Sequence, residues 1–104
     1  MAKQESHIAD SINRRFFVAV DYLVTMGRVH SLEVLCEKLG LHSPRYREMR
    51  LTYGITPNPK SKPSRYKNIE MDAIYFLCIE YSISAEWLML GRGKMFKDET
   101  KRKI

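Results

Sequence analysis

Residues 31–50 read SLEVLCEKLGLHSPRYREMR, which is two short helical patterns with a glycine between them. Ser31 is a good cap for the first helix, and Gly40 can end that helix in the left-handed conformation. Three residues further on, Ser43 can cap a second helix that runs to about Tyr53, with Pro44 at its first position. The apolar residues of the first helix recur at helical spacing: Leu32, Leu35, Cys36 and Leu39. The stretch therefore predicts a helix-turn-helix, whose second helix commonly enters the DNA major groove.

The second helix of this motif has two different faces. An advance of about 100° per residue gives an inner face of Tyr46, Met49 and Tyr53 and an outer ridge of Pro44, Arg47, Glu48 and Leu51. A guanidinium at Arg47 can pair with guanine through two hydrogen bonds, and Glu48 can accept one from a cytosine amine. Ser43 and the free N–H groups of the helix start can bind a phosphate oxygen. This helix is therefore the candidate for reading base edges.

The charge of the chain is concentrated in one segment. The sequence has 104 residues and a net charge of +6, and the whole excess falls in residues 41–68, where Glu48 is the one acidic residue. Such a block attracts polyanions, although a solvated basic loop is the alternative. Elsewhere, Arg14 and Arg15 form a basic pair that we expect to be solvent-exposed, with a phosphate contact as the alternative. The residues expected at phosphates are His42, Arg45, Arg50, Lys60, Lys62, Arg65 and Lys67.

Three further helices are predicted, over residues 11–26, 69–80 and 85–90. Asn68 is placed to cap the second of these and Ser84 the third. The helix at 69–80 is apolar on nearly all sides, so we expect it to be central and buried. Its residues 73–79 are an unbroken apolar run, for which a buried strand is the alternative. The fold class expected is all-α, with five helices.

The domain is expected to span residues 11–96, between an N-terminal tail at 1–10 and a charged C-terminal tail at 97–104. Three prolines prevent a regular helix in residues 55–67. This basic, proline-rich loop is either an extra arm on the DNA backbone or a disordered insert.

Other classes of protein are disfavoured. The N-terminus is too polar for a secretory signal, and no segment approaches the roughly 18 apolar residues of a membrane span. Cys36 and Cys78 lie in apolar runs without metal or redox spacing, so we expect reduced core cysteines in a cytoplasmic protein. No nucleophile is paired with a base, and no glycine-rich phosphate loop follows a strand. We expect no enzyme activity, metal, cofactor or small-molecule substrate.

Residues 31–50 resemble the helix-turn-helix of the lambda repressor-like regulators, the Cro/CI-type or XRE family. The stretch AEWLMLGRGKMF at 85–96 is similar to the WL-x-x-G-x-G-x-M ending of many small members. The resemblance implies a five-helix DNA-binding domain, often dimeric, and it assigns base contacts to Ser43, Pro44, Arg47 and Glu48. Tyr46 departs from the family pattern, which usually has a smaller aliphatic residue there.

The function expected is sequence-specific binding of double-stranded DNA by a small homodimeric transcription regulator, a repressor. The alternative is a protein-interaction or dimerisation module that has kept the fold without specific DNA binding. In that case Trp87, Leu88 and Leu90 are candidates for a self-complementary patch. No sensor domain accompanies the helices, so we expect regulation to come from a partner or from dimerisation.

Overall fold

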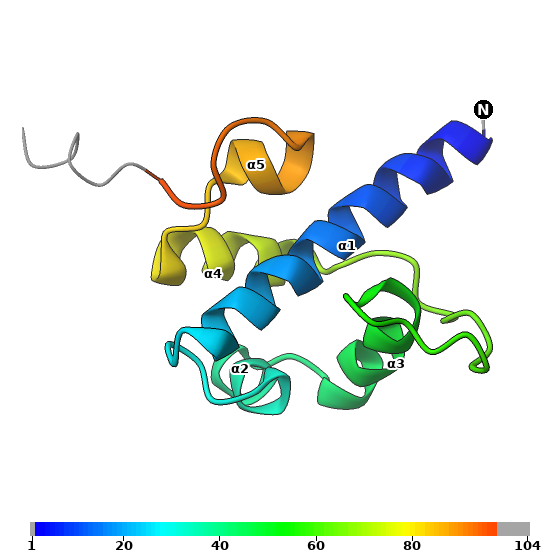
Figure 1. Ribbon diagram of the computed structural model, residues 1–104, viewed down its shortest axis with the longest axis horizontal. Helices are drawn as coiled ribbons and strands as arrows, with labels where there is room; N and C mark the ends of the chain where they lie inside the picture. Colours follow the sequence, from blue (N-terminus) through cyan, green and yellow to red (C-terminus); the bar gives the residue numbers. More distant parts are fainter. Residues whose placement is uncertain (1, 98–104) are drawn as a thin grey trace, which may run out of the picture.

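The computed structural model describes residues 2–97, and within this range the fold is all-α. The one β feature in these residues is an isolated bridge between Ile83 and Phe96. Of the predicted C-terminal tail, residues 98–104 lie outside the described residues. The described helices, shown in Figure 1, are α1 (Ala2–Thr25), α2 (Leu32–Leu39), α3 (Ser43–Tyr53), α4 (Met71–Tyr81) and α5 (Ala85–Leu90). The predicted fold class is confirmed.

The first helix is longer than predicted. It begins at Ala2, so the N-terminal tail expected at residues 1–10 was wrong for residues 2–10. No proline or glycine interrupts this segment, and Ser11 is an interior residue of the helix. Its hydroxyl donates to the carbonyl oxygen of His7, one turn earlier, at 3.1 Å. The extra turns let α1 run across the whole molecule in Figure 1.

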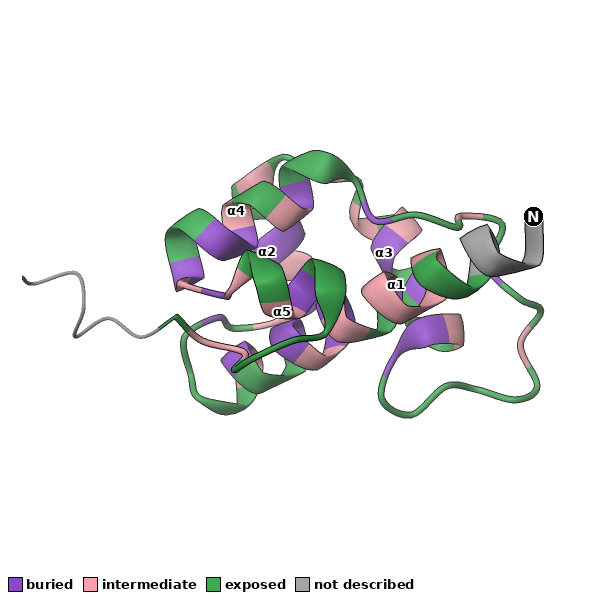
Figure 2. Cartoon of the chain, turned by 90° about the horizontal axis from the view of Figure 1, so that it is seen from above, coloured by how far each residue is buried: buried purple, intermediate pink, exposed green. Residues whose placement is uncertain are grey.

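The core is built around α1, which contacts α2, α3 and α5. Buried residues face one another from all the helices, whereas the outer surfaces are exposed (Figure 2). Cys36 and Cys78 are both buried and free, as predicted. The largest fully buried apolar side chains are Phe16, Leu23, Leu32, Leu35, Tyr46, Met49, Leu77, Ile83 and Leu88.

The helix-turn-helix forms as predicted, with one change at its turn. The Ser31 hydroxyl caps α2 by accepting from the Val34 N–H at 3.1 Å, and Gly40 ends α2 with φ 70°. The predicted cap at Ser43 was wrong, because α3 begins at Ser43 and its N-cap is His42. The His42 carbonyl already accepts from the Arg45 N–H at 3.1 Å, which starts the helical turn one residue earlier.

The start of α4 also differs from the prediction. Asn68 does not cap it, since α4 begins at Met71 and Glu70 is the N-cap without a side-chain bond. The N–H groups just before α4 are instead satisfied by other helices. The Ile69 N–H donates to Asn13 Oδ1 of α1 at 3.2 Å, and the Glu70 N–H donates to the Tyr46 hydroxyl of α3 at 3.1 Å. The residues that lead into α4 are thus held by partners distant in sequence, and the helix begins without a side-chain cap.

The predicted helix at α4 is confirmed over the strand alternative, but the expectation that it is central and buried was wrong. Three large apolar side chains, one turn apart, face solvent: Met71, Tyr75 and Ile79. The helix is apolar all round because one face belongs to the core and the other forms an exposed stripe.

The cap of α5 is confirmed, with the Ser84 hydroxyl accepting from the Trp87 N–H at 3.2 Å. At the other end, Arg15 of α1 donates from Nε to the Leu88 carbonyl at 2.8 Å and from Nη2 to the Met89 carbonyl at 3.1 Å. Arg15 therefore binds α5 rather than solvent, contrary to expectation. Leu88 is fully buried and cannot belong to an exposed patch.

Candidate nucleic-acid interface

The inner face of α3 is fixed firmly to the core. Tyr46 and Met49 are fully buried and Tyr53 almost so, as the helical periodicity predicted. The Tyr46 ring lies 5.7 Å from that of Phe16 on α1. Its hydroxyl donates to Glu70 Oε1 at 2.9 Å while accepting from the Glu70 N–H, and burial raises the pKa of Tyr46. A tyrosine at this position therefore joins α3 to the start of α4, which a smaller aliphatic side chain could not do.

The outer face of α3 brings three of the four base-edge candidates together at its N-terminal end. Pro44 and Arg47 are exposed and Ser43 is half-buried. Among the described residues, Arg47 makes no ion pair with an acidic side chain. A long cationic side chain on a rigid helix is thus free to contact an external acceptor.

Glu48, the fourth base-edge candidate, is engaged by the chain itself. Its Oε2 accepts from the Ser64 hydroxyl at 3.3 Å and from the Arg65 N–H at 3.1 Å. Its Oε1 lies 3.4 Å from Nη2 of Arg65. Contact with a cytosine amine would compete with these interactions. Periodicity could place Glu48 on the outer face, but it could not show that the loop returns to that side chain.

The Arg65 N–H, more than its guanidinium charge or the Ser64 hydroxyl, holds the pKa of Glu48 below its usual value of 4.5. Because the pKa of Glu48 is lower in the folded protein than in the unfolded chain, ionised Glu48 stabilises the protein above pH 4.5. This contribution to the free energy of unfolding is lost as the pH falls through the pKa of Glu48 in the folded protein. We expect Glu48→Gln to unfold at lower urea than the wild type at about pH 7, and by a smaller margin at about pH 3. Glu80→Gln on α4 is the control, because it removes a negative charge that is not bound to the loop. An equal difference at both pH values would contradict this role of Glu48.

The basic loop at 55–67 is fastened to α3 near both of its ends. The Asn58 N–H donates to the Leu51 carbonyl at 2.9 Å, and the Ser64 N–H donates to the Thr52 hydroxyl at 2.8 Å. Ser64 is buried. In addition, Asn13 Nδ2 of α1 donates to the Lys67 carbonyl at 2.8 Å. The loop is thus an ordered arm beside α3 and not a disordered insert.

The seven phosphate candidates divide into two groups. Three make contacts within the chain, of which the contact of Arg50 is the longest and most exposed. Arg45 donates to the Asn68 carbonyl at 2.6 Å and lies over the Tyr66 ring, Arg65 pairs with Glu48, and Arg50 lies 3.8 Å from Glu33. Four are exposed with no ion pair among the described residues, namely His42, Lys60, Lys62 and Lys67.

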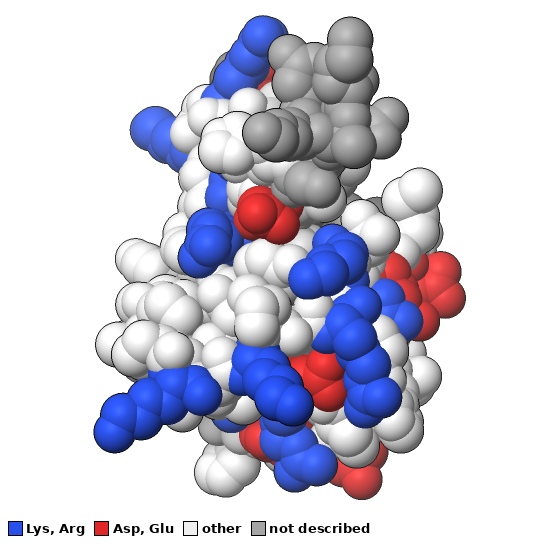
Figure 3. Space-filling model, turned by 90° about the vertical axis from the view of Figure 1, so that its right-hand side faces the viewer, with Lys and Arg blue, Asp and Glu red and all other residues white. Residues whose placement is uncertain are grey.

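The surface around α3 gains a further cation from α1 and is limited by acids on α2. Exposed Arg14 lies over the Tyr53 ring of α3, 5.7 Å from its centre, and so adds a cation beside the exposed Arg47, Lys60, Lys62 and Lys67, which we call the basic face. Figure 3 shows many Lys and Arg side chains on one side of the molecule, with a few acidic side chains among them. On the other side, Glu33 and Glu37 of α2 line a shallow groove of about 330 Å³ with Ser43. The basic face therefore extends from α3 toward the loop and α1, away from α2.

Two further properties of the described residues concern membranes and metal ions. No described helix combines the length and the apolar character needed to cross a membrane. Nor do three or more His, Cys, Asp or Glu side chains of the described chain gather where they could hold a metal ion.

Comparison of the chain with protein-family models, with curated proteins and with solved structures finds no match. Function is therefore inferred from α3, the arm beside it and the charges that they expose.

Proposed function

We propose that this protein binds double-stranded DNA sequence-specifically, with the outer face of α3 in the major groove. The observation that carries the proposal is the position of Arg47. It is exposed and without an ion pair among the described residues, on a helix whose opposite face is buried and which follows α2 across a short turn. Ser43 and Pro44 lie beside it at the helix start. A rigid helix with a free guanidinium suits bidentate pairing with guanine.

The arm at 55–67 is proposed to contact the DNA backbone. Lys60, Lys62 and Lys67 are exposed, and the arm that carries them is attached to the same helix that would read the bases. Cations on such an arm neutralise phosphates without regard to sequence. In this proposal Glu48 acts through the arm, by holding it in register with α3.

The test begins with duplexes selected from a random pool, whose binding is measured by fluorescence anisotropy at several salt concentrations. We expect Arg47→Ala to weaken the selected site by about 1–3 kcal/mol, roughly 5- to 150-fold, and to relax base preference. Lys60→Ala should weaken all sequences alike and reduce the salt slope by about 1. Lys94→Ala, beyond α5, is the matched control and should change neither the affinity for DNA nor the salt slope. Absence of duplex binding at low salt would refute the proposal.

We further propose that the protein is a homodimeric transcriptional repressor, in keeping with its resemblance to the lambda repressor-like regulators. The exposed stripe of Met71, Tyr75 and Ile79 on α4 supplies apolar surface for association. A two-fold dimer would present two copies of α3 to half-sites about 34 Å apart, and the selected sequence would be palindromic.

The same stripe favours the second candidate function, a protein-interaction module without DNA binding. Sedimentation with and without the selected duplex separates the two. A dimer that binds one duplex supports the regulator, whereas a dimer that leaves DNA unbound supports the interaction module.

A further inference from the structure

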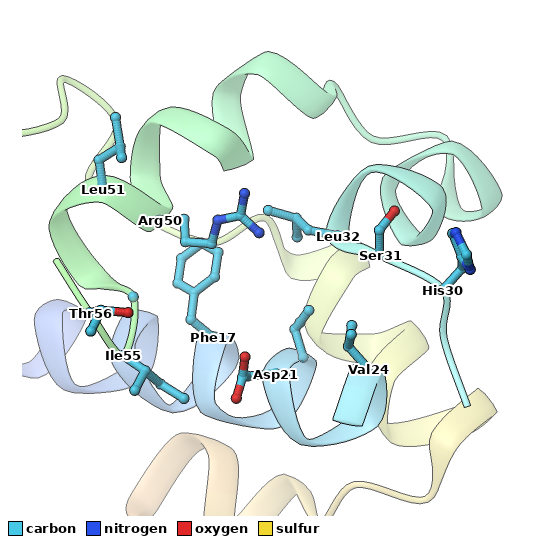
Figure 4. Close-up of a pocket in the computed structure, with 12 residues that line it drawn as sticks. Phe17, Asp21, Val24, His30, Ser31, Leu32, Arg50, Leu51, Ile55 and Thr56 are labelled. Carbon is cyan, nitrogen blue, oxygen red and sulfur yellow. The ribbon is translucent and has the colours of Figure 1, made fainter. Parts of the chain in front are cut away.

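A cavity of about 270 Å³ lies between α1, the start of α2 and the end of α3. Its floor is apolar, formed by Phe17, Val20, Val24 and Leu32. Two oppositely charged side chains also line it, Asp21 from α1 and Arg50 from α3 (Figure 4). The volume lies just under the range of about 300–1,000 Å³ that is typical of ligand sites, so an occupant must be small.

Both charged groups are available to an external ligand. Asp21 is exposed and makes no ion pair among the described residues. Arg50 lies 3.8 Å from Glu33, and both side chains of that pair are more than two-fifths exposed. An ion pair so long and so exposed is weak, and Arg50 can leave it for a better acceptor.

The lining defines the chemistry of the ligand. The carboxylate of Asp21 suits an ammonium, and the guanidinium of Arg50, which faces it from α3 in Figure 4, suits a carboxylate through two hydrogen bonds. The apolar floor beside them suits a short apolar side chain. A ligand with only one charge would leave one of the two groups without a partner.

We propose that this cavity binds a small zwitterion with an apolar side chain, such as a free aliphatic amino acid. Its ammonium pairs with Asp21, its carboxylate with Arg50, and its side chain lies on Phe17 and Val24. Such a site goes beyond DNA binding and stands or falls independently of it, because its test uses the protein without DNA.

The probe is L-leucine, added to the full chain while the methyl chemical shifts of Val20, Val24 and Leu32 are followed. For a ligand of this size we expect a dissociation constant of about 1 mM. Asp21→Asn and Arg50→Gln should each weaken binding about tenfold, because each removes a charge-assisted hydrogen bond. Asp72→Asn, an exposed position on α4, is the matched control and should bind like the wild type.

Two leucine derivatives identify which end of the ligand meets which residue. Leucinamide lacks the carboxylate, so its weaker binding should be insensitive to Arg50→Gln and still sensitive to Asp21→Asn. N-acetyl-leucine lacks the ammonium and should show the reverse. Two outcomes would overturn the proposal. One is that the methyl signals of the three residues do not shift when the leucine concentration is ten times the expected dissociation constant. The other is that both variants bind leucine with the same affinity as the wild type. Thermal unfolding of each variant verifies that it is folded.

Discussion

Asn13→Ala is expected to lower the free energy of unfolding by about 2–5 kcal/mol. Asn13 is buried in α1, where its Nδ2 donates to the Lys67 carbonyl and its Oδ1 accepts from the Ile69 N–H. Alanine leaves both backbone groups without a partner. The buried Ile69 N–H then costs about 1–3 kcal/mol, and the part-buried Lys67 carbonyl costs somewhat less. Because small domains are stable by only about 5–15 kcal/mol, this single side chain accounts for a large part of the total. Urea unfolding followed by circular dichroism measures the difference.

The matched control for Asn13→Ala is the same substitution at Asn68, which the sequence suggested as a helix cap. The structure places Asn68 before α4 with its side chain exposed, and Glu70 is the N-cap. We expect Asn68→Ala to change stability by less than about 0.5 kcal/mol, as at other surface sites. If Asn68→Ala instead lowered the free energy of unfolding by about 1 kcal/mol, Asn68 would act as a helix cap after all. A similarly small effect at Asn13 would show that its two bonds do not hold the chain between the arm and α4.

Leu35→Ala is expected to cost about 3–5 kcal/mol. Leu35 is fully buried on α2, in the core that also contains Tyr46 and Met49 of α3. Removal of its branched side chain leaves a cavity at the base of the helix-turn-helix, and the surrounding helices can close it only in part. The variant should unfold at much lower urea, and its surviving folded fraction should bind the selected duplex more weakly because α3 is less firmly fixed.

Leu90→Ala is the control for Leu35→Ala, since Leu90 is 63% exposed at the end of α5. The same change in chemistry should there alter stability by less than about 0.5 kcal/mol. Comparable losses in the two variants would mean that α2 is not packed against α3 as described.

The features that the sequence predicted well depend on neighbours in the chain. The cap of α2 links Ser31 to Val34, three positions away, and Gly40 ends that helix through its own backbone freedom. The buried face of α3 follows from the helical period alone. Residues 11–25 form a helix as expected, but the earlier start of α1 was missed because Ser11 can either begin a helix or lie within one.

The features that the sequence could not show depend on residues far apart. Asn13 lies 56 positions before Ile69, and Tyr46 lies 24 before Glu70, so the start of α4 is decided by α1 and α3. The same holds at the candidate site. Glu48 and Arg45 bear the right chemistry for DNA, yet the returning loop occupies both of them. Periodicity gives the face of a helix but not which segment covers that face.

The anchoring of the arm has a consequence for how such a surface can diversify. The arm is attached to α3 at Asn58 and at Ser64, whereas Lys60 and Lys62, which lie between these two residues, are exposed. Lengthening a surface loop adds only slowly to its entropic cost. Insertions or charge changes between Asn58 and Ser64 can therefore accumulate without disturbing Arg47. Under the proposed DNA-binding function, the strength of attraction to the DNA backbone and the choice of base sequence could then evolve as separate traits.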